Sequence, residues 1–299
     1  MWKSPARSFN YPEIGDLGNV SRLGTPPRTL SGPARVPPQI DIHKPSAARV
    51  YDAVLGGKDN FAWDRAVAER AMTVFPGCRT SAIMNRQTLG RAVRYMSARG
   101  IDQFLDLGSG LPTAQNTHEI AQAVNPAARV VYVDNDPLVL VHGRALLAEN
   151  PQTTAVMADI RWPDTILTSP TVIGFLDFSR PIGLILNAVI HHVNDDENPR
   201  AIVTAFKCAL APGSYLQLTH FSTAAPEAAA LEQVLMQAIG SGRMRSRQEF
   251  TSFFDGLELV GPGVVFAPEW RPDTTVRYPL ETCAKLLLSG MGYKPWPKT

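Results

Sequence analysis

Short apolar runs alternate with amphipathic helical segments along most of the chain that follows Gly100. Each run has the length of one strand, and each segment between runs has the length of a crossover helix. This alternation is typical of a parallel sheet with right-handed crossovers and helices on both faces, so we predict an α/β, Rossmann-like fold. The runs that predict strands are 103–107, 129–134, 154–159, 182–187 and 214–219, and the helices between them lie near 113–124, 137–149 and 198–210.

The end of the chain departs from this alternation. Two helical segments, near 226–239 and 246–254, lead to two late strands at about 257–267 and 284–293. We therefore expect the core to span 101–299.

The first 100 residues divide into two parts. Residues 1–40 hold seven prolines and four glycines without any apolar periodicity, which predicts a disordered tail. From 41 to 100 the pattern is helical, with a short helix that begins after Pro45-Ser46 and ends at Gly56-Gly57. Two more helices are expected at about 62–75 and 80–99.

Three predicted strands in a row end in an aspartate, at Asp106, Asp134 and Asp159. Open α/β sheets bind ligands outside the carboxyl ends of their strands, so three carboxylates at one edge favour a ligand site over three separate turns. Gly108 and Gly110 follow the first strand and leave bare backbone that can lie close against a ligand.

The spacing of this glycine turn disfavours a dinucleotide. A third glycine and an open helix start for a pyrophosphate are missing, because Leu111, Pro112 and Thr113 stand there. A cofactor with an amino-acid end, a ribose and an adenine fits better. In that reading Asp106 faces an ammonium, Asp134 the ribose hydroxyls and Asp159 the adenine amino group.

These residues resemble the first three motifs of class I S-adenosylmethionine (SAM)-dependent methyltransferases, and more closely those of an actinobacterial S-adenosyl methyltransferase family. The resemblance covers about 46–294. It is carried by the stretches Ala48–Phe61, Phe104–Thr113, Val130–Pro137, Leu210–Tyr215 and Phe253–Val260.

The resemblance implies a seven-stranded, mostly parallel sheet that ends in an antiparallel pair. It also implies SAM as cofactor and S-adenosyl-L-homocysteine (SAH) as product. Besides the three aspartates and the two glycines, we expect cofactor contacts from residues next to the same motifs, namely Tyr51, Gly57, Ser109, Asn135, Ile160 and Asn187.

The segment from Arg49 to Phe61 gathers polar and aromatic side chains around a Gly-Gly turn. Such a segment can close over a cofactor as a lid and exclude water, which favours attack on a sulfonium. An ordinary helix packed on the edge of the sheet is the alternative.

Histidines follow the fourth and fifth predicted strands, at His191, His192 and His220. A histidine there can take a proton from the methyl acceptor. The resemblance favours His191, because methyltransferases of this architecture often place a histidine in the loop after the fourth strand. Transfer by positioning alone, without a base, stays open.

Charge and cysteine usage exclude other classes. The net charge is only +2 and the sequence has no basic stripe, so nucleic acid is not expected as a partner. Cys78, Cys208 and Cys283 are far apart and predict neither a disulfide framework nor a metal site. We expect a cytoplasmic monomer or homodimer without a membrane span that methylates a small molecule. A SAM- or SAH-binding protein without transfer activity is the alternative.

Overall fold

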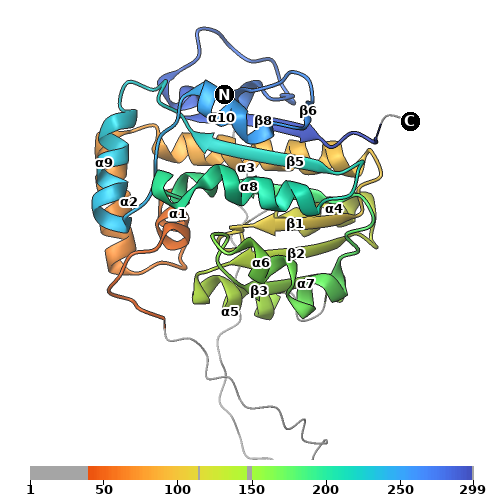
Figure 1. The fold of residues 1–299 in the computed structure, drawn as a ribbon. Helices are drawn as coiled ribbons and strands as arrows, with labels where there is room; N and C mark the ends of the chain where they lie inside the picture. Colours follow the sequence, from red (N-terminus) through yellow and green to blue (C-terminus); the bar gives the residue numbers. More distant parts are fainter. Residues whose placement is uncertain (1–39, 114, 147–149, 298–299) are drawn as a thin grey trace, which may run out of the picture. The chain divides into compact units, whose positions relative to one another are not determined.

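The structure is a computed structural model that describes residues 40–297 except 114 and 147–149 (Figure 1). The predicted tail therefore lies outside the described residues, apart from Ile40.

A mostly parallel sheet forms the centre of this part of the chain. Its strands follow the order β3-β2-β1-β4-β5-β8-β6, and β7 also pairs with β8. The first five strands are parallel and β8 runs antiparallel to β5. Because β1 lies between β2 and β4, the carboxyl ends of the central strands meet at one edge. The parallel strands and β8 are β1 (Gln103–Leu107), β2 (Arg129–Asp134), β3 (Thr153–Met157), β4 (Gly183–Asn187), β5 (Tyr215–Phe221) and β8 (Leu287–Tyr293).

The α/β fold predicted from the sequence is confirmed, but the strand count was wrong. The described residues contain eight strands instead of seven, because the run at 257–267 forms two short strands, β6 (Glu258–Leu259) and β7 (Val265–Phe266). Gly261, Pro262 and Gly263 separate them. The Gly263 amide closes a turn on the Val260 carbonyl, and a proline has no amide to donate to a neighbouring strand.

Two layers of helices cover the two faces of the sheet. One face packs α3 (Cys78–Ser97) and α4 (Thr117–Val124) against Phe104, Val130 and Ile185. On the other face, Leu105, Val131 and Leu184 belong to a core with α6 (Pro163–Leu167), α7 (Pro170–Phe175) and α8 (Pro199–Ala209). Figure 1 shows α8 in front of the sheet and α3 behind it. The helix α5 (Pro137–Leu146) packs along β3.

Three further helices gather beside the carboxyl edge: α1 (Ala47–Leu55), α2 (Ala62–Val74) and α9 (Ala228–Ile239). The start predicted for α1 is confirmed, since the Ser46 hydroxyl accepts from the Arg49 amide as an N-cap. α1 packs on α2 and α3, and α2 packs on α9, so segments far apart in sequence meet here (Figure 1). The remaining helical elements are α10 (Arg247–Thr251) and the 3₁₀ turns η1 (Ile190–His192), η2 (Asp195–Glu197), η3 (Ser252–Phe254), η4 (Ala267–Glu269) and η5 (Thr282–Lys285).

Candidate active site

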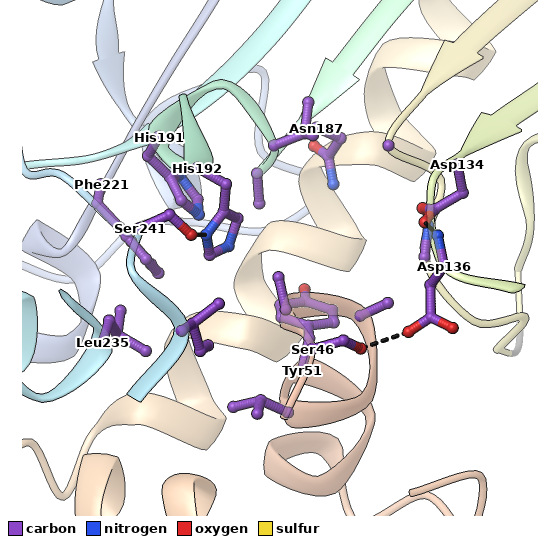
Figure 2. A pocket seen from close by; sticks show the side chains of 18 of the residues that line it. Ser46, Tyr51, Asp134, Asp136, Asn187, His191, His192, Phe221, Leu235 and Ser241 are labelled. Atoms are coloured by element: carbon purple, nitrogen blue, oxygen red, sulfur yellow. Dashed lines mark hydrogen bonds between the residues drawn. The ribbon is translucent and has the colours of Figure 1, made fainter. Parts of the chain in front are cut away.

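A cavity of about 410 Å³ opens at the carboxyl edge of the sheet. The loops after β1 to β3 form one wall, and α1, α3, α9 and η1, which follows β4, form the other. In Figure 2, Asp134 and Asp136 lie on one side of this space, and His191, His192 and Leu235 lie on the opposite side. This volume lies within the range of small-molecule sites.

Asp134 is fixed by backbone amides at the end of β2. Its Oδ2 accepts from the Gly110 amide at 2.8 Å, and its Oδ1 accepts from the Asp136 amide at 2.9 Å. Burial raises the pKa of Asp134 to about 6, although these hydrogen bonds oppose the shift. Each oxygen keeps a further lone pair, so the carboxylate can still accept two hydroxyl groups.

The two glycines of the turn after β1 serve different purposes. Both have a positive φ, 67° at Gly108 and 68° at Gly110. A Cβ on Gly108 would come within 2.1 Å of the Val189 side chain, whereas a Cβ on Gly110 would meet nothing within 4 Å. Gly108 is therefore required by packing, and Gly110 leaves open space beside Ser109 at the cavity.

Asp106 lies deeper, at 4% exposure, and accepts from the Thr117 hydroxyl at 2.7 Å. Burial raises its pKa to about 6, and the hydrogen bond from Thr117 and the charge of Arg86 oppose the rise. Arg86 itself lines the cavity from α3. Its Nη2 donates to the Gln115 carbonyl at 3.0 Å, but its Nε is buried without a hydrogen-bond partner in the described part of the chain.

Arg86 was missed in the sequence. A signal was present, because Arg86 stands three residues before Leu89 and seven before Val93, inside the apolar stripe of its helix. With Asp106, it places opposite charges at the same end of the cavity.

Arg161 was also missed in the sequence. In the structure it binds the Asp159 carboxylate. Its Nε donates to Asp159 Oδ1 at 2.9 Å, and its Nη1 donates to Glu197 at 2.8 Å. Asn135 Nδ2 donates to Asp159 Oδ2 at 3.2 Å. Burial alone would raise the pKa of Asp159, but the hydrogen bonds from Arg161 outweigh it and lower the pKa. Asp159 and Ile160 both line the cavity.

A chain of polar side chains crosses the floor of the cavity. Asn85 Nδ2 donates to the Tyr51 hydroxyl at 3.1 Å, and the Thr219 hydroxyl donates to Asn85 Oδ1 at 2.7 Å. Asn187 Oδ1 accepts from Gln217 Nε2 at 3.3 Å. Figure 2 shows the Asn187 amide nitrogen directed into the cavity.

Two of the three candidate histidines line the cavity. His191 is 1% exposed and stacks on Phe221, with ring centroids 3.8 Å apart. Its Nδ1 is buried and has no partner among the described residues. His192 lies beside it with Nδ1 3.0 Å from the Ser241 hydroxyl. Burial lowers the pKa of His192 to about 4, and burial and the neighbouring His192 lower that of His191 well below its usual value.

His220 does not line the cavity. It is fully buried, with Nδ1 2.6 Å from the Phe221 carbonyl and Nε2 2.7 Å from an Arg245 guanidinium nitrogen. Both ring nitrogens therefore have partners within the protein, as expected for a histidine with a structural role.

Gly57 also lies outside the lining. A Cβ there would come within 2.0 Å of the Asp52 carboxylate, which accepts from the Asp59 amide and from Asn60. Its role in the structure is to let the turn after α1 close on Asp52.

The start of α1 is fastened across the cavity. The Ser46 hydroxyl donates to Asp136, and the Arg49 guanidinium lies 3.7 Å from the same carboxylate (Figure 2). Tyr51 follows one turn later, against the floor. These contacts attach the start of α1, part of the segment predicted as a lid, to the loop after β2.

Within residues 40–297, excluding the gaps, no cluster of three or more histidine, cysteine or acidic side chains is arranged to hold a metal ion. Within the same described ranges, no helix combines the length and apolar character of a membrane span.

A family model for S-adenosyl methyltransferases matches residues 33–295. The chain belongs to the S-adenosyl methyltransferase family. This confirms the family predicted from the motifs, and the match extends over both the core and the N-terminal helices.

Two solved structures support the same assignment. A methyltransferase candidate from Thermobifida fusca is 48% identical, with a TM-score of 0.84, and the alignment covers 88% of this chain and all of that one. A DUF574 family protein from Streptomyces avermitilis is 36% identical, with a TM-score of 0.82, over 86% of this chain and all of that one. No curated protein matches the chain significantly.

Proposed function

We propose that this member of the S-adenosyl methyltransferase family binds SAM in the cavity and transfers its methyl group to a small-molecule acceptor. When bound, SAM supplies a methyl group on a positively charged sulfur. The observation that carries the proposal is Asp134, a carboxylate fixed by the Gly110 and Asp136 amides with lone pairs left for a ribose diol.

Asp106 and Arg86 are placed to bind the amino-acid end of the cofactor. A carboxylate and a guanidinium on one end of the cavity fit the ammonium and carboxylate groups of an amino acid. Arg86 Nε, which has no hydrogen-bond partner among the described residues, supports this assignment, since a buried donor without a partner costs free energy that a ligand carboxylate would recover. The loop of Asp159 and Ile160, with Asn135, is left for the adenine.

The chain's contribution to transfer is orientation and exclusion of water. The tie from Ser46 to Asp136 and the position of Tyr51 favour closure of α1 over the sulfur. A dry site strengthens the reactivity of an acceptor held in line with the methyl group.

Calorimetric titration of the full chain with SAM, SAH and NAD tests the binding step. We expect SAM and SAH to bind and NAD not to compete; tighter binding of NAD would contradict the proposal. Formation of SAH in the presence of acceptors then separates a methyltransferase from a protein that only binds SAM.

A further inference from the structure

The cavity continues past Asn187 into a second compartment, here called the acceptor side, between α1, α2, α9 and η1. Its walls are apolar and almost fully buried. The side chains come from two helices, α1 and α9, and from the start of β8, namely Val50, Val54, Leu231, Leu235, Ile239 and Leu287.

The acceptor side carries no charged side chain among the described residues. Every charged residue that lines the cavity lies at the carboxyl ends of β1 and β2, on the loops after β2 and β3, on η2, at Lys44 before α1, or at Arg86 of α3. Beyond Asn187, the polar groups are hydroxyls, amides and the rings of His191 and His192. A charged ligand group would therefore lose its hydration without gaining an ion pair.

The two histidines supply the directional contacts. Burial disfavours their charged forms, so both are neutral at neutral pH and each has one donor and one acceptor nitrogen. His191 Nδ1 is buried and has no partner in the part of the chain that the structure describes, and Ser241 fixes the orientation of His192. A ligand hydroxyl can both donate to and accept from such a pair.

This chemistry discriminates among methyl acceptors. An alkyl amine is an ammonium at neutral pH and a carboxylic acid is an anion, and neither finds an opposite charge here. A carbon acid must lose its proton before attack, which needs a stronger base than a histidine whose charged form is disfavoured.

We propose that the acceptor is an uncharged, largely apolar molecule that presents a phenolic or enolic hydroxyl to His191 and His192. The proposal rests on the proposed SAM-dependent transfer. The hydroxyl oxygen forms a bond to the methyl carbon while the bond from that carbon to sulfur breaks, and sulfur keeps the electron pair as a thioether.

The hydroxyl proton passes to the ring nitrogen of His192 that does not contact Ser241, and from there to water. A weak base suffices, because the oxygen becomes strongly acidic as the methyl group bonds to it. Since burial keeps the pKa of His192 near 4, the ring returns to its neutral form after each turnover.

Three naphthalenes of matched shape test the class of acceptor: 2-naphthol, 2-naphthoate and 2-naphthylmethylammonium. Each is titrated into the SAH-loaded full chain at neutral pH. We expect 2-naphthol to bind at least about tenfold more tightly than either charged compound. Equal or tighter binding of a charged compound would overturn the proposal, as would absence of 2-naphthol binding at up to about 1 mM.

A charge introduced among the apolar side chains of the acceptor side gives a second test. Leu235→Glu should weaken 2-naphthol binding by at least about tenfold and strengthen binding of the ammonium compound by a similar factor. Gln233→Glu puts the same charge on the exposed face of α9 and should change neither. Unchanged 2-naphthol affinity in Leu235→Glu would remove α9 from the acceptor side.

The two proposals fail in different ways. If SAH itself does not bind the wild-type chain, the proposed function is wrong. If SAH binds and the charged naphthalenes are preferred, only the acceptor class is wrong. Because SAH affinity is measured in each variant, a misfolded Leu235→Glu is recognised, and the wild-type series still decides.

Discussion

The two sides of the cavity are built in opposite ways. The side of the cavity at the carboxyl ends of β1 to β3 is called the cofactor side here, after its proposed ligand. Its charged groups lie at strand ends and on short loops and are fixed by nearby backbone, as Asp134 is by Gly110 and Asp136. On the acceptor side, uncharged side chains from α1, α9 and η1 meet only through tertiary packing, in which α2 packs on both α1 and α9 and η1 packs on β5. The charged side can be recognised from local motifs, whereas the neutral side depends on tertiary structure.

Replacing His192 by glutamine should have the largest effect on this comparison. Turnover of an accepted phenol should fall about 10²- to 10⁴-fold, because glutamine keeps a polar group but cannot take the proton. SAM affinity, measured by calorimetry, should stay within about threefold, since His192 lies on the acceptor side. Turnover within about threefold of the parent would indicate transfer by positioning alone.

Protonation at low pH should weaken SAM binding on the cofactor side and leave ligand binding on the acceptor side unaffected. Burial raises the pKa of Asp106 and Asp134 to about 6. In the proposed binding mode both carboxylates are ionised when SAM binds. Affinity should therefore rise with pH through 6, by about tenfold for each carboxylate between pH 5 and pH 7. Asp106→Asn should remove one of the two steps in the pH profile, and a flat profile in the wild-type chain would contradict the assignment.

Asp134→Ala should weaken SAM binding by about 1–3 kcal/mol, the range for lost hydrogen bonds to a charged acceptor. Asp196→Ala is the matched control, because Asp196 is exposed and does not line the cavity. Equal affinities of the two variants in calorimetry would take Asp134 out of the cofactor site.

Arg86→Gln should have a smaller effect that depends on the ligand. SAM binding should weaken by about 1–2 kcal/mol through loss of a charged hydrogen bond. Methylthioadenosine lacks the amino-acid end, so its affinity should not change. A similar loss for both ligands would mean that Arg86 acts through the structure of α3.

These contrasts explain which features the sequence could predict. Asp106, Asp134 and Asp159 were accessible because a strand end and the residue that follows it fix each other locally. Arg161 was not, because no motif marked it. For Arg86 the only signal was a charged residue inside the apolar stripe of its helix, and the docking of α3 decides which groups Arg86 meets. His220 and Gly57 looked similar to site residues in the sequence, but His220 is held by Arg245 and Gly57 lies in the turn that closes on Asp52, and neither lines the cavity.

The split of the predicted strand at 257–267 has a local cause instead. The prediction of a strand is confirmed at both ends of this run, where β6 and β7 pair with β8. The interruption comes from the Gly-Pro-Gly turn, whose geometry a search for apolar periodicity does not detect.

A crystal structure of the full chain with SAH tests the central claim most directly. We expect the ribose hydroxyls within about 3 Å of the Asp134 oxygens, the amino-acid end between Asp106 and Arg86, and the sulfur facing the uncharged compartment of His191 and His192. SAH bound elsewhere, or with its sulfur turned away from that compartment, would contradict the division of the cavity into a charged cofactor side and a neutral acceptor side.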